Sequence, residues 1–419
     1  MGSCLKIPSS EKVYYPHQGL NFEVPPSAKN KIYQLALKYY NLGNYVGALQ
    51  LFLWLGNYKN SPQYVKLLRK FFKAPSVDSI KGEPTVRVLL GRNFKEVIIG
   101  KGRTYKVIFL RDKFLFKGKE LKNLHLEIKK TTYLTVVGKN YRRTYPVKGE
   151  LTFLNKEGEN YLILSLPLEE YLKGVLPKEV YPSWPIEALK AQAVAARTYA
   201  LYNLLKNRNK PYDVDSTTLS QVFGGVSIGK RTTNLAVELT RGQILTYEGN
   251  VIYAMYSSNN APCTHSFKEL LKIDLPYLEK VKDIYSLKAP KWVSWERKVP
   301  KEVILKKLQK YGFDLIQIRD IKIAKTNGCK RVLWITLEGK YKKITLPVDF
   351  FFRYLLRLPS DSFFITGKSG KYITFSGIGF GHGLGMSQWG AYVMAQEGKS
   401  YREILSFYYP HTKLEKVYK

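Results

Sequence analysis

Glycine occupies every second position from 377 to 385 in the stretch GIGFGHGLGMSQWGAY (377–392), which also holds one histidine, His382. Alternate residues of an extended chain point to the same face, so the pattern predicts a face without side chains. Glycine weakens a strand interior, so the repetition indicates that something flat approaches the backbone or that positive φ angles are required. The alternative is a mobile glycine-rich loop. Neither a G-x-G-x-x-G nor a P-loop spacing fits, which argues against a nucleotide ligand.

The composition predicts a globular, strongly basic protein. With 419 residues, of which 45% are hydrophobic, the chain is long enough for two or three domains with their own cores. Lysine and arginine number 68 against 33 acidic residues, and the net charge of +35 attracts polyanions such as nucleic acid, anionic lipid or an acidic cell-wall polymer. The basic residues are spread along the chain without a nucleic-acid-binding signature, so we expect an acidic glycan and no nucleic acid as partner.

The cysteines and the N-terminus bear on location. No apolar run reaches the length of a membrane span, and the start of the chain lacks the apolar core of a signal peptide. The opening MGSC has the small residues that precede the acylated cysteine of bacterial lipoproteins, so Cys4 is a candidate lipid anchor. The three cysteines form neither a disulfide framework nor a zinc spacing. At most Cys263 and Cys329 pair; the alternative is two buried thiols.

The N-terminal part is predicted to be helical. After a tail over residues 1–27, residues 28–75 repeat apolar and aromatic residues at helical spacing, with a break at 41–44. This predicts a helical hairpin, and the run from Tyr39 resembles a tetratricopeptide unit. One unit is too short for a stable solenoid, so we expect it to pack on its neighbour or on a partner.

The remaining chain, 86–417, shows no long linker and is expected to form one body. Short alternating segments over 86–165 predict strands. In 166–417, Pro167 and Pro185 each open a helix, and the second helix carries an alanine-rich stripe that predicts a buried central position. Strand-like pieces follow to about 375, with a helical patch from Pro300 to Tyr311. The fold class is therefore α+β, a mixed β-rich body around an alanine-rich helix, with the small N-terminal helical hairpin docked at one side.

The segment LPKEVYPSWP (176–185) between these two helices holds a candidate catalytic acid, Glu179. The prolines stiffen the backbone, and apolar neighbours disfavour the ionised form, which raises the pKa towards that of a proton donor near neutral pH. The alternative is an ordinary surface charge. Arg197 lies within the alanine-rich helix, where a buried guanidinium requires an acceptor, most naturally a carboxylate.

A polar loop, YDVDSTTLSQVFGG (212–225), follows these helices. Its short side chains could present Thr217, Ser220 and Gln221 to sugar hydroxyls. The alternative is an ordinary turn.

Three of these segments together carry a resemblance. The segments LPLEEYLKGVLPKEVYPSWPIEALKAQAVAARTYAL, DSTTLSQVFGG and GIGFGHGLGMSQWGAYVMAQEG, the last followed by ILSFYYP, occur in the order and spacing of the SpoIID/LytB family of bacterial peptidoglycan proteins. That family includes lytic transglycosylases, typically acting on glycan stripped of stem peptides, and amidase enhancers. The resemblance implies a catalytic acid/base at Glu179 and a substrate-binding helix arginine at Arg197. It also implies glycan-binding residues at Gln221, His382, Ser387 and Gln388.

The chain also departs from the family's pattern. Many members have Cys-Asp-Thr-Thr-His-Cys-Gln where this chain has residues 215–221, and some bind zinc there. Those ligands are absent, and Cys263 with His265 supplies too few, so we expect no structural zinc and no cofactor. The family's His-Ser-Thr-Ser-Gly-Gly segment is replaced by YSSNNAPCTH from Tyr256, which puts some glycan contacts in doubt.

The resemblance implies a peptidoglycan lytic transglycosylase that uses Glu179 as its single acid/base, located in the extracytoplasmic cell envelope. A glycan would lie against the glycine face, with Trp389 either at its edge or in the core. The alternative is a non-catalytic wall-binding protein or amidase enhancer, whose helical hairpin recruits an amidase or a division protein. The residues themselves give no support for a sporulation-specific role.

Overall fold

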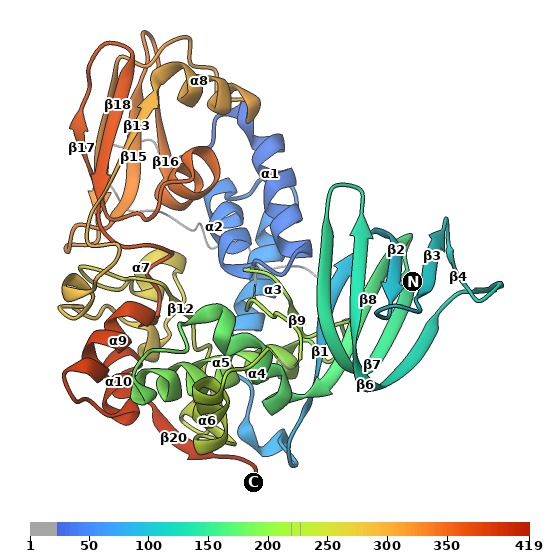
Figure 1. Ribbon diagram of the computed structural model, residues 1–419. Helices are drawn as coiled ribbons and strands as arrows, with labels where there is room; N and C mark the ends of the chain where they lie inside the picture. The colour runs from blue at the N-terminus through green and yellow to red at the C-terminus, as the bar shows by residue number, and fades with distance from the viewer. Residues whose placement is uncertain (1–22, 219, 227) are drawn as a thin grey trace, which may run out of the picture.

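The computed structural model describes residues 23–218, 220–226 and 228–419. Cys4, and with it the possible lipid anchor, lies outside the described residues. The described chain is α+β, as predicted: helices and several separate sheets are built around a helical centre (Figure 1). Within the described residues, no helix is long and apolar enough for a membrane crossing.

The N-terminal part is a unit of three helices. They are α1 (Pro26–Asn41), α2 (Tyr45–Leu55) and α3 (Ser61–Phe72). The predicted break between the first two is present: Gly43 has a φ of 79°, and the Asn44 side chain caps α2 by accepting from the Gly47 N–H at 3.0 Å. The hairpin prediction missed the second turn, where Gly56 and Lys59 have positive φ before α3 begins.

This helical unit packs against the body on two sides, and Figure 1 shows it between two β-rich parts. On one side the ring of Tyr39 lies 4.4 Å from that of Tyr354. On the other, Phe71 contacts Tyr202 of the central helix at 5.7 Å between ring centroids. The unit is therefore continuous with the main core, as expected for helices too few to stand alone.

The region predicted to be β-rich supplies eight strands of a nine-stranded sheet, in the order β5-β4-β3-β2-β6-β7-β8-β1-β9, and β9 comes from the polar loop. All neighbours are antiparallel except β1 and β9. The strands are β1 (Thr85–Arg92), β2 (Phe94–Ile99), β3 (Tyr105–Leu110), β4 (Lys113–Phe116), β5 (Lys119–Leu121), β6 (Leu124–Gly138), β7 (Arg142–Lys156), β8 (Glu159–Pro167) and β9 (Val214–Asp215).

The sheet leads into the two predicted helices, α4 (Leu168–Glu179) and α5 (Ile186–Lys206). Pro167 and Pro185 stand directly before them, as expected, and Pro177 lies inside α4, so the connecting hinge begins only at Val180. Helix α5 is buried on nearly all faces from Ala188 to Asn203, and its alanines let α4, α6, α9, α10 and β10 approach closely. The alanine-rich helix is thus the centre of the body.

Smaller elements surround this centre. The helices are α6 (Arg231–Leu239), α7 (Phe267–Leu271), α8 (Lys301–Lys310), the π-helical turn Phe350–Leu356, α9 (Gln388–Gln396) and α10 (Tyr401–Tyr408). Two three-stranded sheets stand at the upper left of Figure 1. One contains β13 (Trp295–Pro300), β18 (Tyr372–Gly377) and β17 (Phe363–Gly367), and the other contains β14 (Asp320–Thr326), β15 (Val332–Glu338) and β16 (Lys343–Pro347). The remaining strands are β10 (Gln243–Tyr247), β11 (Asn250–Val251), β20 (Lys413–Lys416), β12 (Tyr256–Ser257) and β19 (Met386–Ser387).

The glycine segment 377–385 is not an extended strand with a bare face. Only Gly377 belongs to a strand, β18, and the other four glycines have φ between 68° and 113°. A Cβ at Gly379 or Gly385 would collide with the carbonyl oxygen of Asn259 or Met255. The prediction that these glycines need positive φ angles and a close approach is therefore correct. The group that approaches them is the protein's own backbone, so the expectation that a glycan lies against the glycine face is wrong.

We expect Gly385→Ala to destabilise the fold more than Gly398→Ala. Both glycines have positive φ, 68° and 83°, but a Cβ at Gly398 meets open space. The backbone conformation alone should cost about 1 to 2 kcal/mol in either variant, and overpacking against Met255 should add about 1 to 3 kcal/mol in Gly385→Ala. Urea denaturation of the two variants measures the difference, and equal losses would contradict the packing described here.

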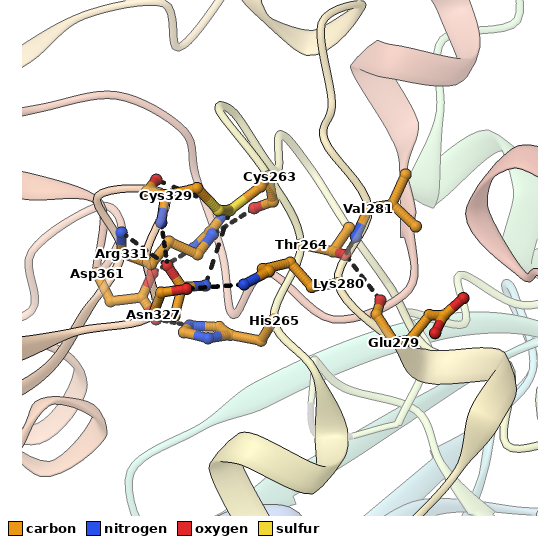
Figure 2. The surroundings of a disulfide bond; sticks show 10 residues. All are labelled: Cys263, Thr264, His265, Glu279, Lys280, Val281, Asn327, Cys329, Arg331 and Asp361. Atoms are coloured by element: carbon orange, nitrogen blue, oxygen red, sulfur yellow. Dashed lines mark hydrogen bonds and ion pairs between the residues drawn. A yellow bond between two sulfur atoms is a disulfide. The ribbon is translucent and has the colours of Figure 1, made fainter.

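Behind the glycine segment, Cys263 and Cys329 form a disulfide, so the pairing left open by the sequence is present (Figure 2). Beside it, His265 Nε2 lies 2.6 Å from Asp361 Oδ2, and Arg331 pairs with the same carboxylate. All three side chains are almost fully buried. Burial acts to raise the pKa of Asp361, but Arg331 and His265 outweigh it and hold the pKa below its usual range.

Removing the disulfide with Cys263→Ala and Cys329→Ala should lower the free energy of unfolding by roughly 2 to 4 kcal/mol, because the bridge closes a long loop. The two cysteines are 66 residues apart in sequence. Reductant should destabilise the parent chain by a similar amount and leave the double variant unaffected. A parent chain whose denaturation midpoint ignores reductant would show that the bridge does not constrain the unfolded state.

Candidate active site

Glu179 is the last residue of α4, and the two later motifs meet at its carboxylate. The Val222 N–H, from the polar loop, donates to Glu179 Oε1 at 2.8 Å. Gln388 Nε2, from the first residue of α9, donates to Glu179 Oε2 at 3.3 Å. The three segments that carry the sequence resemblance are therefore joined at one partly exposed carboxyl group.

The environment of Glu179 favours its protonated form. Burial raises the pKa of this carboxyl above its usual value, and the two hydrogen bonds from Val222 and Gln388 oppose the rise without cancelling it. Both donors are neutral, and Glu179 forms no ion pair with any described residue. Its position at the C-terminal end of α4 works in the same direction, because the negative end of the helix dipole disfavours a carboxylate.

Gln388 is positioned by a glutamine that the sequence analysis did not single out. Gln192 lies on α5, is 1% exposed, and its Oε1 is 3.5 Å from Gln388 Nε2. The Gln388 Nε2 group thus contacts both Glu179 and Gln192, and this orients the amide with its N–H side towards the Glu179 carboxyl group. A lone buried glutamine within an alanine-rich helix was the available signal, since buried amides require partners.

Three residues expected to bind glycan are instead buried supports. Gln221 is fully buried: its Nε2 donates to Ala196 O and to the Tyr256 hydroxyl, each at 3.0 Å, and its Oε1 accepts from Tyr171. These bonds hold the loop so that Val222, the next residue, faces Glu179. The motif therefore reaches Glu179 through the Val222 backbone N–H and not through the Gln221 side chain.

Ser387 and Arg197 are also fully buried. Ser387 caps α9 by accepting from the Gly390 N–H at 3.1 Å, which places Gln388 at the helix start. Arg197 donates through Nε and Nη2 to the two oxygens of Glu169, each at 2.8 Å. The predicted carboxylate partner is present, but neither side chain can touch a ligand without rearrangement, which corrects their assignment to glycan binding.

His382 is held within the glycine segment as a neutral imidazole. Its Nε2 donates to the Tyr256 carbonyl at 3.0 Å, and its Nδ1 accepts from the Leu384 N–H at 3.1 Å. Burial, followed by the charge of Arg353, lowers the pKa of His382 to about 3. The half-buried ring is therefore no proton carrier, and its visible role is to bind the glycine segment to β12.

Thr217 and Ser220 lie at the other end of the polar loop. The Thr217 N–H donates to Asp215 Oδ1 at 2.6 Å, and Ser220 Oγ accepts from the Asp215 N–H at 3.1 Å. Both side chains are partly exposed. Ser220 lines a cavity that Glu179 does not line.

An aromatic cluster, formed by Tyr181, Trp184, Trp389 and Tyr392, stands beside Glu179 and Gln388 in the chain. The Trp184 and Trp389 rings are 4.8 Å apart, and Tyr181 lies 6.0 Å from Trp389. Trp389 is 7% exposed and therefore mainly core, whereas Tyr181 is 49% exposed. Lys291 donates to the Tyr181 hydroxyl at 2.9 Å. The cluster thus presents one accessible ring two residues from the carboxyl group.

Comparisons with known proteins match two parts of the chain. A family described as SpoIID, stage II sporulation protein, matches residues 156–247, which contain Glu179, Arg197 and the polar loop. A domain of unknown function, DUF8618, matches residues 264–385. Neither match includes the three N-terminal helices, and nothing in these comparisons supports a tetratricopeptide assignment for them.

Relatives match over about three fifths of the chain. An uncharacterized protein of Brachyspira hyodysenteriae is 38% identical over 62% of this chain and 70% of its own length. The amidase enhancer of Bacillus subtilis is 35% identical over 58% of this chain, and the match spans 40% of that protein. The stage II sporulation protein D of Bacillus subtilis is 32% identical over 62% of this chain and 77% of its own length. This chain therefore belongs to the SpoIID/LytB family.

Proposed function

We propose that this protein is a peptidoglycan lytic transglycosylase, with Glu179 as its single acid/base. The observation that carries the proposal is the convergence of three separate motifs on one carboxyl group whose pKa is raised. Perturbed carboxyl groups held by neutral donors are typical of catalytic acids. The ring of Tyr181, two residues later in the chain and 49% exposed, offers a face on which a sugar can stack.

The absence of a charged partner favours a transglycosylase over an ordinary glycosidase. Glycosidases need a second carboxylate, at about 5 to 5.5 Å for retention or further away for inversion. Among the described residues, the groups bonded to the Glu179 carboxyl are the neutral Val222 N–H and Gln388 amide, and it forms no ion pair. A lytic transglycosylase needs only one carboxyl group, because the substrate supplies the nucleophile.

The reaction would proceed in two proton transfers. Glu179 first donates its proton to the glycosidic oxygen as the bond from the anomeric carbon breaks, which leaves the carboxylate. The primary hydroxyl of the same muramic acid then attacks the anomeric carbon, and the carboxylate takes its proton. The products are a free 4-hydroxyl on one strand and a 1,6-anhydro end on the other, and Glu179 is again protonated. Val222 and Gln388 stabilise the carboxylate between the two steps.

The second candidate is a non-catalytic wall-binding protein that recruits an amidase, and the name of the Bacillus subtilis relative favours it. The net charge of +35 and the extra helical unit also suit an anionic polymer and a protein partner. Under either candidate, the site of action is the cell envelope outside the cytoplasm.

Product analysis separates the two candidates. The chain is incubated with glycan strands stripped of stem peptides, and the ends are analysed by mass spectrometry. We expect strand ends lighter by one water, the mark of anhydro-muramic acid, and no such ends with Glu179→Gln. Binding of the strands without new ends would leave the amidase-enhancing role.

A further inference from the structure

A cavity that Glu179 does not line has a volume of about 300 Å³. It lies between the turn joining α1 and α2, the adjacent ends of β1 and β8, and the segment that follows α5. One wall, residues 40–45, belongs to the helical unit, which neither family match covers. The cavity therefore exists only because the helical unit is docked on the body.

Four tyrosines, Tyr40, Tyr45, Tyr161 and Tyr212, supply much of the lining. Tyr45 and Tyr161 are 6% and 9% exposed, and the rings of Tyr161 and Tyr212 lie 6.4 Å apart. Tyrosine offers a flat apolar face with a polar rim, which suits a sugar ring. The volume is at the lower end of the range for ligand sites, so it fits one or two sugar rings rather than a long chain.

The charges at this cavity are unevenly compensated. Arg92 pairs with Glu159 and also contacts the Tyr161 ring. Lys210 differs: its ammonium lies 4.4 Å from the Tyr45 ring centroid and donates to the Tyr45 hydroxyl, and no described carboxylate lies within ion-pair distance of it. Residue Lys210 is exposed, although burial of its ammonium lowers the pKa to about 8, so the group is still mainly charged at neutral pH.

Acceptors for sugar hydroxyls line the same cavity. Four carboxyl groups, those of Glu157, Glu159, Asp213 and Asp215, and the Ser220 hydroxyl line it. Glu157, Glu159 and Asp213 each pair with a lysine or arginine, and burial raises the pKa of Asp215. Aromatic faces, acceptors for hydroxyl groups and one unpaired cation together select a ligand that has a ring, several hydroxyls and a carboxylate.

We propose that this cavity binds a carboxylated sugar, with Lys210 pairing with the carboxylate and the tyrosines holding the ring. The choice of muramic acid as that sugar rests on the proposed function, because it is the carboxylated sugar of the proposed substrate. The cavity would hold a strand, or a released fragment, at a distance from the cleavage site and give the helical unit a part in retaining glycan.

The test is calorimetric titration of the full chain with N-acetylmuramic acid and N-acetylglucosamine, which share the ring and differ by the lactyl carboxylate. We expect N-acetylmuramic acid to bind about tenfold tighter. Lys210→Met should remove that difference, and Lys210→Arg should keep it. The methionine retains the apolar contact with Tyr45, and circular dichroism checks that both variants fold. Glu302→Gln, which breaks only an exposed pair with Lys306, should bind both sugars as the parent does.

Three outcomes would overturn the proposal: equal affinity for the two sugars, a preference that survives Lys210→Met, or equally tight binding of free D-glutamate, which carries a carboxylate without a ring. Failure here is distinguishable from failure of the proposed function. A chain that makes anhydro ends but shows no sugar preference refutes only the cavity site. A chain that prefers N-acetylmuramic acid through Lys210 but makes no anhydro ends refutes only the enzyme.

Discussion

Replacing Glu179 with glutamine should lower the rate of glycan cleavage by about 100-fold to 10,000-fold, the usual worth of a general acid/base. Glutamine keeps the shape of the side chain and can still accept from the Val222 N–H, but it cannot donate a proton to the glycosidic oxygen. The rate is measured as anhydro ends released per unit time. Glu187→Gln is a matched control, because Glu187 opens α5 and makes its contacts with Lys190 and Tyr401, away from Glu179.

The pH dependence of the rate tests the same role independently. The first step needs the protonated acid, so the rate should fall as the pH rises through the raised pKa of Glu179. Removing the Gln388 amide with Gln388→Leu takes away a donor that stabilises the carboxylate, so the fall should move to higher pH. If the rate of Gln388→Leu falls at the same pH as that of the parent, or if Glu179→Gln keeps the parent's rate, Glu179 is not the acid/base of the mechanism.

Local patterns were sufficient to predict several parts of the structure. Pro167 and Pro185 marked helix starts because proline fits the first turn and little else in a helix. The alanines of α5 predicted a buried helix because small side chains serve close packing, and the helix is indeed central. The proline and aromatic neighbours of Glu179 predicted its raised pKa, because these neighbours are adjacent to it in the sequence.

The rest depended on contacts between distant residues. The glycine repeat showed that close approach was needed, but the approaching backbone at Met255 and Asn259 is more than a hundred residues earlier in the chain. Gln221 and Ser387 read as ligand contacts because polar residues in a motif look alike whether they face a ligand or the protein. Their full burial, and the link from Gln192 to Gln388, follow only from the packing of α5 against the polar loop and α9.

Replacing Arg197 with methionine should lower the free energy of unfolding by roughly 3 to 5 kcal/mol, because it leaves a buried carboxylate without its partner. Arg197 and the Glu169 side chain are 0% and 2% exposed, and two parallel hydrogen bonds join them. Burial acts to raise the pKa of Glu169, but Arg197 outweighs it and holds the pKa below the usual 4.5. The pair's contribution is therefore present above that value and lost as the pH falls through the lowered pKa.

Urea denaturation at neutral pH measures the loss, and two controls define its origin. Glu302→Gln breaks a fully exposed pair with Lys306 and should leave the unfolding free energy nearly unchanged. Adding Glu169→Gln to Arg197→Met removes the unpaired buried carboxylate and should restore part of the stability. If Arg197 instead bound glycan, its loss would weaken substrate binding while the denaturation midpoint stayed in place. A lowered midpoint with unchanged affinity for the strands would place Arg197 in the framework that carries Glu179, since α4 holds both Glu169 and that residue.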